Sequence, residues 1–92
     1  MEEENKFKLI DGVFDIKDAK EILLSLIGHK IKYHNTKIFG DLERYGVHDE
    51  HSITRVEQLK KTRQKIVQLI EMSEKTNKQL VLNATITIET LK

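Results

Sequence analysis

Four histidines are the residues of this 92-residue chain best suited to acid–base or metal chemistry, and they stand at positions 29, 34, 48 and 51. His48 and His51 lie three apart in the segment "HDEHS", with two carboxylates between them. Imidazole and carboxylate together form a ligand set that zinc or nickel accepts, but a closed zinc site needs four ligands. No further obvious ligand stands elsewhere, so His48 and His51 are weak candidates for a metal site and no cofactor is predicted.

The segment "HDEHS" also holds the three residue types of a hydrolytic triad. Contiguous residues rarely form a working triad, because the base must be oriented by a third group and an oxyanion hole is needed as well. Asp49 is instead interpreted as the N-cap of a helix, with Ser52 as the alternative cap. The sequence contains no glycine-rich phosphate loop and no cofactor fingerprint. It therefore predicts a protein that is not an enzyme.

Composition narrows the class of protein further. The chain has no cysteine and a formal net charge of +1, which excludes disulfides and thiolate chemistry and does not favour a strong nucleic-acid binder. The opening "MEEENKFK" lacks the apolar segment of a secretion signal, and no apolar run approaches the roughly 20 residues that span a bilayer. The expected location is the cytoplasm, without membrane contact.

Hydrophobic periodicity predicts four elements in the order β-α-α-β, an α+β domain that is mostly helical. Period-two alternation indicates strands at about 6–10 and 80–90, and helical periodicity runs over about 16–45 and 50–76. Asp15 and Asp49 are suited to the two N-cap positions, and Gly46 suits the left-handed residue just past a helix C-terminus. The short turn makes the two helices an antiparallel hairpin, so the two strands start from the same end.

Each helix carries an apolar seam that steps by three and four residues. Antiparallel partners have a constant sum of residue numbers, and a sum of 97 pairs Ile38 with Leu59 and Ile31 with Ile66. The same sum places His34 opposite Arg63, each the polar interruption of its seam. We interpret this pair as a polar layer that fixes the register, or alternatively as a binding site for an anion or a carboxylate. Arg63 is expected to lower the pKa of His34, because a nearby cation disfavours the charged imidazole.

The predicted register also brings two basic runs to the same height. Lys32 falls opposite Lys65 and Lys37 opposite Lys60, which gives a positive belt with Tyr33 inside it. Such a belt suits phosphates or an acidic partner, and Tyr33 can stack on a base. Nucleic-acid binding is therefore the alternative function, although a solvated helix face explains the same charges.

The apolar residues outnumber what one thin hairpin and a two-stranded ribbon can cover. Ile22, Leu26 and Phe39 lie off the seam of the first helix, and a two-stranded ribbon is marginal alone in water. Association of two copies into a four-helix bundle with a small sheet solves both problems. The sequence predicts a small homodimeric interaction, assembly or regulatory module that can bind a further protein partner.

Overall fold

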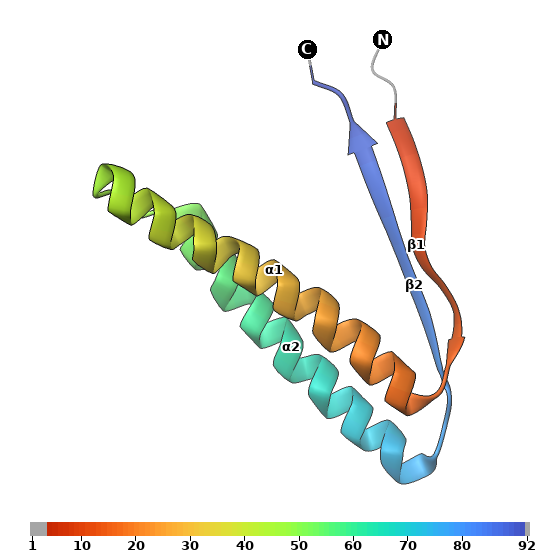
Figure 1. Cartoon of the computed structure of the whole chain (residues 1–92). Coiled ribbons are helices and arrows are strands. Elements are labelled where there is room, and N and C mark those ends of the chain that lie inside the picture. The colour runs from red at the N-terminus through yellow and green to blue at the C-terminus, as the bar shows by residue number, and fades with distance from the viewer. Residues whose placement is uncertain (1–3, 92) are drawn as a thin grey trace.

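The computed structural model describes residues 4–91 and has the predicted β-α-α-β order (Figure 1). The elements are β1 (Glu4–Phe14), α1 (Ile16–Tyr45), α2 (Glu50–Thr76) and β2 (Leu80–Glu89). The α+β class and the helical hairpin are therefore confirmed, and both helices have the predicted bounds. Within residues 4–91, neither helix combines the length and the apolar character needed to cross a membrane.

The helices begin and end where local hydrogen bonding dictates. The Asp15 carboxylate accepts a 2.8 Å hydrogen bond from the backbone N–H of Asp18, and the Asp49 carboxylate accepts one of 3.1 Å from that of Ser52. Both are N-cap bonds that satisfy a donor left free in the first helical turn. Gly46 ends α1 with φ of 63°, where a side chain would be strained, and its N–H donates to a carbonyl of the last turn.

The ribbon is longer than its first strand was predicted to be. β1 extends over 4–14 and pairs antiparallel with the whole of β2. The prediction ended the strand at residue 10 because Asp11 and Gly12 form a typical turn sequence. They lie within the strand instead, opposite Asn83 and Leu82, because β2 is long enough to pair with their backbones.

One residue of β1 has no partner in the ladder. The register shifts between Lys8 and Ile10, so Leu9 is the extra residue of a bulge. The bulge reverses the alternation of side chains, and Phe7 comes onto the same face as Ile10 because each lies beside a residue of one face of β2.

That face of the ribbon points towards α1 at the base of the hairpin. A pocket of about 470 Å³ lies between them, lined by Leu9, Ile10, Asp11 and Phe14 of β1 and by Ile22, Ser25 and Leu26 of α1. The cross-strand pairs of the face are Phe14 with Leu80, Gly12 with Leu82, Ile10 with Ala84, Phe7 with Ile86 and Asn5 with Ile88. We call it the helix-facing side of the ribbon.

The chain is open rather than compact. The ribbon leaves the base of the hairpin at an angle, and the two arms diverge from there (Figure 1). The extents are 50 × 36 × 15 Å and the radius of gyration is 16.7 Å, against about 12 Å for a compact domain of this length. Among the described residues, the buried apolar side chains are Ala19, Val56, Leu59 and Ile70.

Gly28 lies within α1 without any geometric need for glycine. Its φ is not positive, and a Cβ built there would meet no atom of the described chain within 4 Å. Gly28→Ala is therefore expected to raise the free energy of unfolding by about 1 kcal/mol, because glycine is a poor helix former. Thermal unfolding should shift upward by about 4–8 °C. A lower midpoint would mean that another backbone packs against this position in solution.

Candidate functional site

The two helices meet in a register different from the predicted one. His34 Nδ1 lies 3.0 Å from Ser52 Oγ, and Lys37 Nζ lies 3.6 Å from an Asp49 carboxylate oxygen. Both pairs have a residue-number sum of 86, eleven below the predicted sum. The predicted pairing of His34 with Arg63 is therefore wrong, and the buried polar layer joins His34 to Ser52 instead.

This difference separates the two basic runs. A shift of eleven residues displaces one helix along the other by about 16 Å. Lys32 and Lys37 therefore do not lie at the height of Lys65 and Lys60, and Lys37 pairs with Asp49 instead. The predicted belt across both helices does not form, which removes the main argument for nucleic-acid binding.

The buried layer is a short chain of hydrogen bonds with a defined polarity. A carboxylate can only accept, so the Ser52 hydroxyl donates to Asp49 Oδ2 at 3.1 Å. The Ser52 oxygen must then accept from His34 Nδ1–H, which leaves His34 Nε2 as a lone pair. In a hydrolytic triad the serine donates to the histidine, so this polarity is the reverse. The arrangement ties the start of α2 to the middle of α1.

His34 is held neutral by its surroundings. Its residue is 6% exposed, and among the described residues no group bonds its buried Nε2 atom. Burial lowers the pKa of His34 below 6.5, and electrostatic repulsion from Lys30, His51 and Arg55 lowers it further. Lowering by neighbouring cations was predicted, but Lys30 and Arg55 supply it rather than Arg63.

Asp49 is held ionised by the same network. The backbone N–H of Ser52 lowers the pKa of Asp49 below 3.8, because the hydrogen bond favours the charged form. The Ser52 hydroxyl and the Lys37 ammonium act in the same direction, against partial burial of the carboxylate. The hydrogen-bond polarity requires an ionised carboxylate, and a neutral imidazole can supply the Nδ1–H donor, so the electrostatics and the geometry agree.

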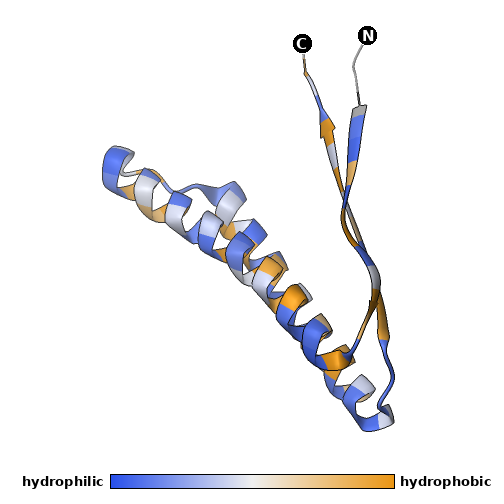
Figure 2. Cartoon of the chain, turned by 45° about the vertical axis from the view of Figure 1, so that its right-hand side comes forward, coloured by the Kyte–Doolittle hydropathy of each residue, from blue (hydrophilic) through white to orange (hydrophobic). Residues whose placement is uncertain are grey.

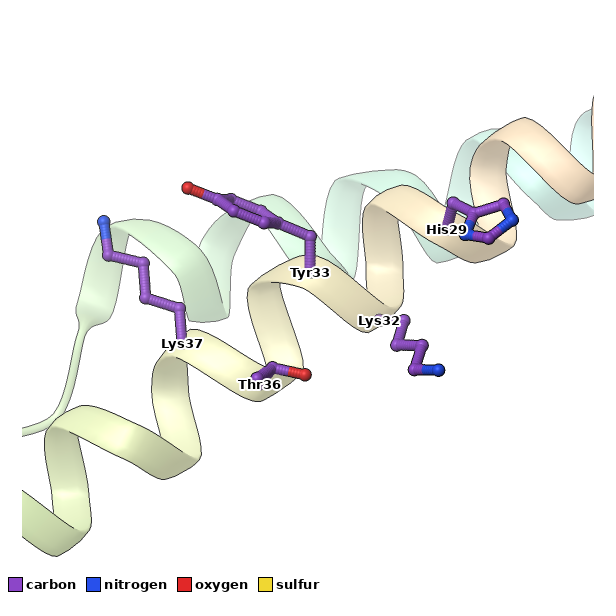
Figure 3. A pocket seen from close by; sticks show the side chains of 5 residues that line it. All are labelled: His29, Lys32, Tyr33, Thr36 and Lys37. Carbon is purple, nitrogen blue, oxygen red and sulfur yellow. The ribbon is translucent and has the colours of Figure 1, made fainter.

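A shallow depression on α1 collects several of the other candidate residues. It measures about 480 Å³ and is lined by His29, Lys32, Tyr33, Thr36 and Lys37. Figure 3 shows Lys32 and Lys37 pointing away from each other, so they do not converge on one ligand. The Lys30 ammonium lies 4.9 Å from the centroid of the Tyr33 ring, where it occupies one ring face. The depression thus offers scattered charges rather than an enclosed binding site.

The remaining candidates lie in two separate places, along α2 and around its start. Lys60 and Arg63 line a second open depression of about 440 Å³ on α2, with Gln64 and Val67, and Lys65 is exposed on the same helix. His48 and His51 are exposed around the start of α2. Within residues 4–91, no three histidine, aspartate or glutamate side chains gather closely enough to hold a metal ion.

Sequence reasoning missed the bond between His34 and Ser52. A sequence signal for it existed, since both residues are polar and lie on the apolar seams of their helices. Arg63 was predicted instead, because it is the polar seam residue that faces His34 when the residue numbers sum to 97. Comparison with known proteins adds no constraint here: no family model, no curated protein and no solved structure matches this chain.

Proposed function

We propose that this protein is a non-enzymatic assembly module that works as a homodimer. The single observation that carries the proposal is the surface left uncovered. The chain exposes 7674 Å² to solvent, whereas a compact monomer of 10.8 kDa exposes about 5,500 Å². The excess is about 2,000 Å². Homodimers that exist only as dimers bury roughly 1,000–2,500 Å² on each partner, so a second copy accounts for the excess.

The chemistry of the uncovered surface supports an assembly role. Among residues 4–91, sixteen large apolar side chains are exposed, and they lie on the ribbon, on both helices, on the turn that joins the helices and, for Leu91, just past the end of β2. Figure 2 shows apolar residues recurring along both strands far beyond the point where the ribbon meets the helices. Isolated exposed apolar residues are ordinary, but contiguous ones indicate an interaction surface.

Solution mass tests this proposal. Light scattering over a wide range of protein concentration should give twice 10.8 kDa, and the mass should persist at high salt because burial of apolar surface is not screened. Dissociation by salt alone would indicate association through charge and would contradict an apolar interface. A mass of 10.8 kDa at every concentration would overturn the proposal.

A further inference from the structure

The end of α1 extends past its partner helix. With a residue-number sum of 86, the first residue of α2 lies level with about residue 36 of α1. The last two turns of α1 therefore have no helix beside them, and the chain returns along them through 46–49 (Figure 1). We call residues 38–47 the α1 tip. The α1 tip is the end of a 30-residue helix, and α2 does not pack against it.

The α1 tip carries an unusual amount of bare apolar surface. Phe39, Leu42, Tyr45 and Val47 are between 43% and 70% exposed. Leu42 and Tyr45 continue the seam that α2 covers further along the hairpin, so the register itself leaves them uncovered. The α1 tip thus presents an apolar helix surface that the returning segment 46–49 leaves largely exposed.

The outer half of the ribbon also exposes apolar side chains to solvent. Phe7, Ile86 and Ile88 lie on the helix-facing side of the ribbon, where they are 54%, 45% and 53% exposed. The pocket of 470 Å³ lies where the ribbon and α1 meet, and these three residues extend its apolar lining towards the free end of the ribbon. A two-stranded ribbon needs packing on one face to be stable in water.

Resting on the proposed homodimer, we infer that the α1 tip of each copy packs into the angle between ribbon and α1 of the other copy. Phe39 and Leu42 then contact Phe7 and Ile86 of the second copy. The lengths agree, since the eight helical residues of the tip span about 12 Å and the five residue pairs of the outer ribbon about 16 Å. The hairpins lie antiparallel, and each ribbon wraps the end of the other hairpin.

Symmetry favours this exchange over contacts between like surfaces. A contact of tip with tip would leave both ribbons bare, and a contact of ribbon with ribbon would leave both tips bare. The exchange occurs twice about one twofold axis, covers both kinds of surface and closes the assembly at two copies. It also uses the excess of surface that the isolated chain exposes.

Substitution of exposed residues tests the contact without disturbing the protomer core. Phe39→Ser and Ile86→Ser should each weaken the dimer about a hundredfold, because each change acts at two contacts and an apolar anchor is worth about tenfold or more per contact. Leu69→Ser is the matched control, since Leu69 is 62% exposed on α2 outside the proposed contact. Its dimer should dissociate as the wild type does. Equal effects of all three changes would contradict the inference.

Cross-linking tests the same contact with milder changes. The chain has no cysteine, so Phe39→Cys and Ile86→Cys each introduce a single thiol. When the two variants are mixed and treated with a short bismaleimide, cross-links between the two different variants should predominate. Neither variant alone should cross-link, because like positions lie at opposite ends of the dimer. Leu69→Cys mixed with Ile86→Cys should give none.

The outcomes separate this inference from the proposed function. A monomeric wild-type chain would overturn both. A dimer without the mixed cross-link, or with cross-links of Phe39→Cys to itself, would overturn the exchange and leave the homodimer standing.

Discussion

Replacing Ile70 with alanine is expected to lower the free energy of unfolding by about 2–5 kcal/mol. Ile70 is 2% exposed and belongs to the small set of buried apolar residues in the described chain. A domain of this length has about 5–14 kcal/mol of stability in total, so the loss is a large fraction of it. The cost combines lost burial with the cavity that a thin core cannot close.

Urea denaturation followed by far-ultraviolet circular dichroism measures this loss. Protein concentration must be held constant, because the proposed dimerisation would contribute to the apparent stability. Leu69→Ala is the matched control, since Leu69 is the preceding residue of the same helix and is 62% exposed. Its effect should stay within about 0.5 kcal/mol. A similar loss in both variants would show that position on α2, rather than burial, determines the effect.

Acidification is expected to destabilise the helical hairpin as pH falls from about 7 through 6.5. The pKa of His34 is lowered from 6.5 in the folded chain, so in this range the unfolded chain binds a proton that the folded chain does not. Protons therefore favour unfolding, and the stability present above pH 6.5 is lost down to the folded pKa. Asp49, whose pKa is lowered from 3.8, adds a second loss in the same direction below about pH 5.

Protonation of His34 destabilises the folded chain because the new positive charge lies near other positively charged or polar groups. A protonated His34 would carry its charge beside Lys30 on α1 and beside His51 and Arg55 on α2, with Asp49 as the opposing charge. Its Nε2–H would also be a buried donor for which the described structure provides no acceptor. The negative charge of Asp49 favours protonation of His34, so it offsets part of this penalty.

His34→Asn isolates this contribution. The asparagine amide can donate to Ser52 as the imidazole does, but it does not titrate. Urea midpoints measured at pH 8 and pH 6 should therefore differ less in His34→Asn than in the wild type. His48→Asn is the control, because His48 is exposed and lies outside the network. If His34→Asn kept the pH dependence of the wild type, the titrating group would have to lie elsewhere.

The helix bounds could be predicted because the signals that set them are local. The Asp15 and Asp49 carboxylates bond to N–H groups three residues along, and Gly46 takes a backbone conformation that suits glycine. Asn77 ends α2 in the same left-handed conformation, with φ of 52°. Each signal involves only a few consecutive residues, so no knowledge of packing was needed.

The candidate site was only partly predictable. His34 was identified as the polar interruption of its seam, and it is buried in the interface as a seam residue should be. Its partner was not identified, because eleven residues make just over three helical turns. A slide by that amount returns nearly the same face of α2 to α1, so the seam pattern alone accepts more than one register.

The sequence by itself determined the four elements, their order and the antiparallel hairpin, since capping, periodicity and a short turn act over short distances. The tertiary structure decided the register, the bulge at Leu9 and the bond from His34 to Ser52. These depend on which of several similar apolar surfaces meet, and that choice is made by the sum of contacts along both helices and both strands. The same choice leaves the α1 tip and the outer ribbon without cover in the single chain.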